Sequence, residues 1–74
     1  MTGAMLVGDD VEILAQTALG SSSIPALRQL QVERVGDSLV ISGRVATFYF
    51  KQLAQEIVRG SARGMNVVNQ IEVT

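Results

Sequence analysis

The spacing of hydrophobic residues predicts a helix in the first quarter of the chain. Between residues 9 and 20, apolar side chains recur at helical spacing on one face, namely Val11, Leu14, Ala15 and Ala18. Asp9, with Glu12 three residues later, forms a capping-box pattern, so we expect the helix to begin at residues 9 and 10. A flexible segment over residues 1–8 would precede it, and Gly20 with the following serines would end it.

This first helix has more apolar residues than one core contact needs. Ile13 and Leu19 lie outside the predicted core face. The only firmly polar positions of this helix are Glu12 and Gln16. We expect Ile13 and Leu19 either to pack under Leu6 and Val7 or to face a second copy of the chain.

The next segment predicts a β-hairpin. After a connector that contains Pro25 and is expected to be a turn or loop, apolar and polar residues alternate from Leu30 to Glu33. Gly36 and Asp37 then form a short reversal. A second alternation over residues 39–45 predicts an antiparallel partner strand.

The last third of the chain predicts a helix and a strand. Thr47 can cap a helix whose core face carries Phe50, Leu53, Ala54, Ile57, Val58 and Ser61. Gly64 is its expected end, and residues 67–73 alternate as a third strand. The order α-β-β-α-β predicts an α+β fold, with a three-stranded mixed sheet covered on one face by two helices.

The amino-acid composition excludes several classes of function. The 74 residues contain 47 % apolar and 18 % charged residues with a net charge of −1, which indicates one small folded domain. There is no cysteine and no histidine, so disulfides, thiolate or imidazole catalysis and ordinary zinc sites are excluded. We expect no enzyme activity, no cofactor and no metal site. No secretory signal or membrane span is evident, which makes the cytoplasm the default expectation; a piece of a longer protein could be envelope-associated.

Several segments, taken in order, resemble a known family. They are the hairpin sequence GDSLVISGRV (residues 36–45), an alanine-bearing helix, and the ending GMNVVNQIEV (residues 64–73). The pattern over residues 9–74 resembles a BON domain, a small bacterial module named for osmotic-stress and nodulation proteins, in a single-domain form. The resemblance implies a non-catalytic module that attaches to phospholipid membranes or to envelope and protein partners. It carries over no catalytic residue.

Phe48 is the leading candidate for a binding residue. If the helix begins after Thr47, Phe48 points away from Phe50 onto the solvated face, beside cationic side chains. An aromatic ring with cations suits an anionic lipid surface or a protein partner. The alternative is that Phe48 folds back onto the hairpin. Tyr49 is expected to be half-buried.

The remaining candidates are basic or structural. Lys51, Arg59 and Arg63, with Arg44 on the second strand, form either a modest basic patch or an ordinary solvated face. Asn69 falls on the apolar face of the third strand, so its amide is expected to bond backbone groups. Gly43 is expected to make room where a helix crosses the sheet.

Two other functions stay open at this point. Spare apolar surface on the first helix favours a self-associating protein-interaction domain without lipid binding, including a homodimer. RNA binding of the KH type is less favoured, because the near-neutral charge and the spacing of Gly60 and Gly64 do not fit it. We therefore expect no nucleic-acid partner.

Overall fold

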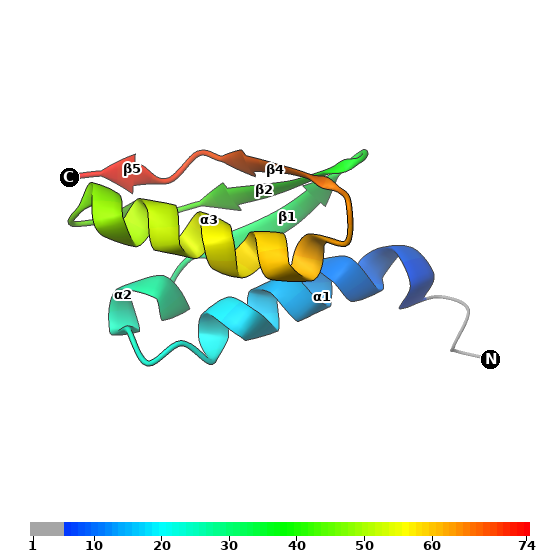
Figure 1. Ribbon diagram of the computed structural model, residues 1–74, viewed down its shortest axis with the longest axis horizontal. Helices are drawn as coiled ribbons and strands as arrows, with labels where there is room; N and C mark the ends of the chain where they lie inside the picture. Colours follow the sequence, from blue (N-terminus) through cyan, green and yellow to red (C-terminus); the bar gives the residue numbers. More distant parts are fainter. Residues whose placement is uncertain (1–5) are drawn as a thin grey trace.

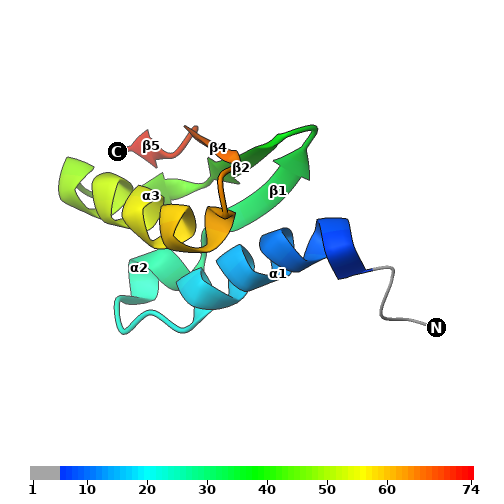
Figure 2. The same cartoon turned by 45° about the vertical axis from the view of Figure 1, so that its right-hand side comes forward.

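The computed structural model describes residues 6–74, and side chains from residue 11 onward. It contains the helices α1 (Leu6–Gly20), α2 (Pro25–Arg28) and α3 (Phe48–Ala62), and the strands β1 (Gln31–Val35), β2 (Ser38–Ser42), β3 (Arg44–Val45), β4 (Asn66–Asn69) and β5 (Glu72–Val73). The three-stranded sheet has the order β1-β2-β4, with β1 antiparallel and β4 parallel to β2. The two long helices lie together on one side of it (Figures 1 and 2). The predicted α+β fold is confirmed.

The boundaries of α1 differ from the prediction. The helix begins at Leu6, so Asp9 and Asp10 lie inside it and the capping-box interpretation is wrong. Residues 6–8 of the predicted flexible segment lie within α1, and residues 1–5 lie outside the described part of the chain. The predicted end at Gly20 is confirmed.

The core face of α1 is rotated from the predicted one. Leu19 is completely buried, whereas Leu14 is 39 % exposed, so both predictions were wrong. A helix that is apolar nearly all round carries little information about which side faces the core. The packing of α1 along α3 and β1 sets that direction instead. Ile13 is exposed, as predicted, and the proposed packing under Leu6 and Val7 lies outside the described side chains.

The connector after α1 is a short helix rather than a loop. Pro25 stands at the first position of α2, where a missing N–H costs nothing and its fixed φ suits the helix. The prediction used the residue before proline, and Ile24 is indeed extended, but the helix starts directly after it. Leu27 of α2 is completely buried and joins the core.

The hairpin is antiparallel and the crossover pair is parallel, as predicted. Val35 pairs with Ser38 across the two-residue turn, and Gly36 supplies the positive φ of 60° that the turn requires. Each described residue of β4 and β5 pairs with the residue 28 positions earlier, on β2 or β3. The second and third predicted strands are each divided in two, but their mutual register does not change.

The break between β2 and β3 occurs at Gly43. Its φ is 133°, and an added Cβ would lie 2.6 Å from Cδ2 of Leu30. Gly43 is therefore structural, as predicted, but it makes room for the residue that precedes β1 rather than for a helix crossing the sheet.

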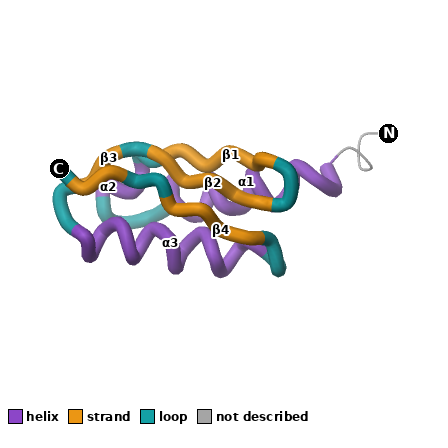
Figure 3. Tube along the Cα trace, turned by 90° about the horizontal axis from the view of Figure 1, so that it is seen from above, coloured by secondary structure: helices purple, strands orange, loops and turns teal. Residues whose placement is uncertain are grey.

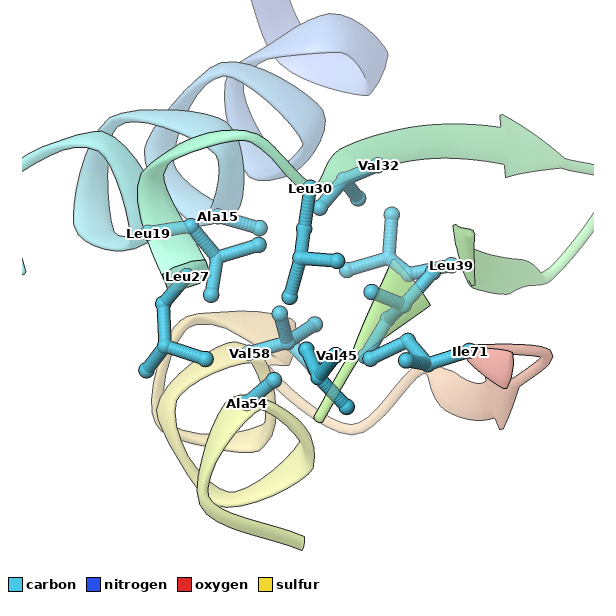
Figure 4. Packing of buried hydrophobic residues seen from close by; sticks show 12 residues of the cluster. Ala15, Leu19, Leu27, Leu30, Val32, Leu39, Val45, Ala54, Val58 and Ile71 are labelled. Atoms are coloured by element: carbon cyan, nitrogen blue, oxygen red, sulfur yellow. The ribbon is translucent and has the colours of Figure 1, made fainter. Parts of the chain in front are cut away.

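The core lies between the helices and the sheet (Figure 4). Twelve hydrophobic residues are buried there: Ala15, Leu19, Leu27, Leu30, Val32, Leu39, Ile41, Val45, Ala54, Val58, Ala62 and Ile71. Among the described residues, no buried side-chain nitrogen or oxygen lacks a hydrogen-bond partner. Polar groups therefore support this packing without leaving an unsatisfied atom inside it.

Candidate binding surface at the start of α3

The first turn of α3 presents two aromatic rings to solvent. Thr47 is extended and its hydroxyl oxygen accepts a hydrogen bond from the backbone N–H of Phe50 at 3.1 Å, which confirms the predicted cap. This fixes where helical periodicity begins, so Phe50 turns toward the core while the two residues before it turn outward.

Phe48 and Tyr49 are among the most exposed large side chains described. Phe48 is 74 % exposed, which excludes the alternative in which it folds back onto the hairpin. Tyr49 is 67 % exposed, so the expectation that it is half-buried is wrong. Its ring lies 5.8 Å from that of Phe50, centroid to centroid, so the partly buried neighbour supports it from one side.

Lys51 places a positive charge close to the Phe48 ring. Its Nζ lies 6.0 Å from the centroid of the Phe48 ring, at the outer limit of a cation–π contact. We call Phe48, Tyr49 and Lys51 the first-turn site. It lies at the same end of the molecule as β5 and the C-terminus (Figure 1).

The other predicted basic residues do not join the first-turn site. Arg59 and Arg63 lie at the far end of α3. Arg59 is eleven positions after Phe48, which is a rise of about 16 Å along the helix. Arg44 is on β3, where its Nε lies 3.2 Å from Glu72 Oε1 in an exposed ion pair. The predicted basic patch is thus dispersed over the surface.

Arg63 and Gly64 end α3 together. Arg63 is the C-cap, with a left-handed φ of 52°, and Gly64 follows with a φ of 89°. Gly64 therefore contributes to the helix end, as predicted, although a residue with a side chain adopts the first left-handed position. The N–H of Met65 then bonds the carbonyl of Ala62 at 3.0 Å.

Asn69 connects β4 to α3. Its Nδ2 donates to the carbonyl oxygen of Lys51 at 3.0 Å and to Gln55 Oε1 at 3.1 Å, and its Oδ1 accepts from the N–H of Ile71 at 3.1 Å. The predicted structural role is confirmed. The sequence prediction did not identify Gln55 as a partner, because it lies on the arc of α3 that was expected to be fully solvated.

Gln16 is the main residue that the sequence interpretation missed. Its Nε2 donates to the carbonyl oxygen of Leu30 and its Oε1 accepts from the N–H of Val32, both at 2.8 Å. The side chain therefore binds the backbone on both sides of the start of β1. One signal in the sequence could have indicated this role of Gln16. The glutamine lies beside the core-facing positions of a helix, and that helix precedes an edge strand.

The described part of the chain offers little support for an enclosed ligand site or a metal site. Residues 6–74 contain no detected pocket and no group of three metal-ligating acidic, histidine or cysteine side chains. None of the described helices combines the length and apolar character needed to cross a membrane. The candidate function therefore rests on exposed surface.

Comparisons with protein families, with curated proteins and with solved structures gave no significant match to this chain.

Proposed function

We propose that this chain is a non-catalytic binding module that attaches to phospholipid membrane surfaces through the first-turn site. The observation that carries the proposal is the exposure of two consecutive aromatic rings, Phe48 and Tyr49, next to Lys51. Aromatic rings favour the boundary between headgroups and acyl chains, and a lysine beside them is attracted to anionic headgroups. The resemblance to BON domains points to the same function.

The expected affinity is low. Burying one aromatic ring contributes about 1.5–3 kcal/mol, and one lysine near an anionic surface adds about 1 kcal/mol. Together these values correspond to a dissociation constant of roughly 1–15 mM. Attachment is therefore reversible, and it strengthens when several modules act together.

An amide-resolved NMR titration tests the proposal. The protein is titrated with phosphatidylglycerol vesicles and, separately, with phosphatidylcholine vesicles. We expect broadening centred on Phe48, Tyr49 and Lys51 with the anionic lipid, and a loss of about tenfold in affinity in Phe48→Ser. Val35→Ala is the matched control, because Val35 is 55 % exposed on another surface and its replacement should leave binding unchanged.

Two outcomes contradict the proposal. If neither lipid changes the spectrum, the isolated chain does not bind membranes through this site. If the changes are confined to residues 13 and 14, the contact lies on α1 instead. Urea unfolding of Phe48→Ser should match the unmodified protein within about 0.5 kcal/mol, because exposed substitutions have small effects.

A second candidate function is self-association through α1. Ile13 is 51 % and Leu14 39 % exposed, so two consecutive large apolar side chains lie on the outer surface of this helix. Burying them against a second copy would remove apolar area from water. Sedimentation velocity over a hundredfold range of concentration distinguishes this function, since Ile13→Asp would abolish a dimer without affecting lipid binding.

A further inference from the structure

The sheet has two edges that differ in how their backbone groups are satisfied. At the β1 edge, Gln16 bonds the carbonyl of Leu30 and the N–H of Val32, both at 2.8 Å, as a neighbouring strand would. This side chain occupies the backbone positions that a strand from another molecule would need at the start of β1.

The β4 edge is arranged differently. The N–H groups of Asn66 and Gln70 bond the carbonyls of Asp37 and Ile41, so they point inward to β2. Successive residues of a strand point their N–H groups to opposite sides, so those of Val67 and Asn69 point outward. No side chain in the described part of the chain bonds these two amides. Figure 3 shows no further strand beside β4.

One flank of α3 lies next to this edge. Asn69 of β4 bonds the carbonyl of Lys51 and the side chain of Gln55, which shows which side of α3 faces β4. Phe48 and Arg59 recur with these residues at spacings of three and four, so all four share that flank. We call Phe48, Lys51, Gln55 and Arg59 the α3 stripe. It contains two cations and no acid.

The opposite face of the sheet adds an apolar component. Val40 pairs with Val68 across β2 and β4, and their side chains point away from the helices because Leu39 and Ile41 point into the core. Val68 is 38 % exposed. A strand added beside β4 would thus place alternate side chains over the α3 stripe and beside Val68.

We propose that the β4 edge accepts an extended segment of a partner protein in which acidic residues alternate with apolar ones. Main-chain hydrogen bonds to Val67 and Asn69 would hold the segment as an added strand. Its acidic side chains would meet Lys51 and Arg59, and its apolar side chains would extend the row of Val40 and Val68. The α3 stripe shares Phe48 and Lys51 with the first-turn site, but this interaction does not require membrane attachment.

The charges of the α3 stripe favour such a segment over a second copy of the chain. Antiparallel pairing of β4 with the β4 of a second copy would bring the α3 stripe toward its own equivalent. Lys51 and Arg59 would then approach identical cations, which is unfavourable. An acidic segment instead supplies opposite charges at the same positions.

A peptide titration tests this assignment. The probe is a capped seven-residue peptide of alternating valine and glutamate, added to millimolar concentration without lipid and monitored by amide-resolved NMR. We expect shifts at residues 66–69 and along the α3 stripe. Arg59→Glu should weaken binding by about fivefold or more, because an attraction becomes a repulsion. Arg28→Glu, the same charge change at an exposed position on α2, should leave binding unchanged.

Two modified peptides make the test specific. The same peptide with lysine in place of glutamate should bind more weakly. A glutamate peptide N-methylated at every residue should lose binding, because neither of its edges keeps the N–H groups that pair with a strand. Shifts at β1 instead of β4, no shift at all, or equal binding of the lysine peptide would overturn the proposal. The peptide titration contains no lipid, and its critical variant, Arg59→Glu, lies outside the first-turn site, so the two proposals fail separately.

Discussion

The β1 edge and the β4 edge are each held to a helix by one side-chain amide, but the two amides act in opposite directions. Gln16 comes from the helix and binds the backbone of the strand. Asn69 comes from the strand and binds the helix, through the carbonyl of Lys51 and the side chain of Gln55. The first arrangement occupies the outward N–H of Val32 at the start of β1, and the second leaves the outward N–H groups of Val67 and Asn69 without a side-chain partner. The element that carries the amide side chain therefore decides whether the outward backbone groups beside it are occupied.

Gly43→Ala should have the largest effect, because it disturbs the β1 edge at Leu30. The new Cβ would lie 2.6 Å from Leu30 Cδ2, at a residue with a φ of 133°. We expect a loss of about 2–4 kcal/mol in the free energy of unfolding, measured by urea denaturation. Gly60→Ala is the control, since nothing lies within 4 Å of its added Cβ and the helix should gain about 0.5–1 kcal/mol. A loss below 0.5 kcal/mol in Gly43→Ala would show that Leu30 moves aside freely.

Gln16→Ala tests the β1 edge directly. The substitution leaves the carbonyl of Leu30 and the N–H of Val32 without their side-chain partner in a partly buried position. We expect a loss of about 1–3 kcal/mol by urea denaturation. Thr17→Ala, at an exposed position of the same helix, should change stability by less than about 0.5 kcal/mol. Equal effects of the two substitutions would mean that water satisfies the edge as well as Gln16 does.

Asn69→Ala should cost less than Gln16→Ala. Three hydrogen bonds are lost, but the freed groups include the side chain of Gln55, which is only partly buried, and a helical carbonyl of α3. We expect about 1 kcal/mol by thermal unfolding. Asn66→Ala, an exposed asparagine of the same strand, should have little effect. A larger loss than that of Gln16→Ala would reverse the ranking of the two amides.

Arg44→Ala should have the smallest effect. The ion pair with Glu72 connects β3 to β5, but the two side chains are 75 % and 67 % exposed. Exposed pairs contribute roughly 0–1 kcal/mol, and salt screens them. We expect less than about 0.5 kcal/mol in urea denaturation at low salt, and less still at 1 M NaCl. A loss comparable to that of Gln16→Ala would show that charge, as well as amide bonding, holds the sheet together.

Local signals in the sequence predicted the elements whose geometry depends on nearby residues. The turn at Gly36 and Asp37 and the cap at Thr47 each involve bonds within a few positions, and both are confirmed. Asn69 was predicted to be structural because a polar residue on an apolar face needs a partner, and it has three.

Packing decided the features that the sequence did not predict. The rotation of α1, which buries Leu19 and exposes Leu14, depends on how α1 packs along α3 and β1. Gln16 was recognised only as a polar position of the first helix, and its bonds were not predicted because its two partners lie 14 and 16 positions away. The exposure of Tyr49 likewise depends on where α3 begins and on what its first turn faces.

The hydrogen bond from the N–H of Val32 to Gln16 can report whether α1 is packed against the sheet. The amide proton of Val32 is held by a side chain of α1 rather than by another strand. Its exchange with deuterated water should therefore follow the local detachment of α1 from the sheet. The amide protons of Glu33 and Val35, which pair with β2, should instead follow the opening of the hairpin. Comparing these exchange rates would measure whether the helix separates before the sheet opens.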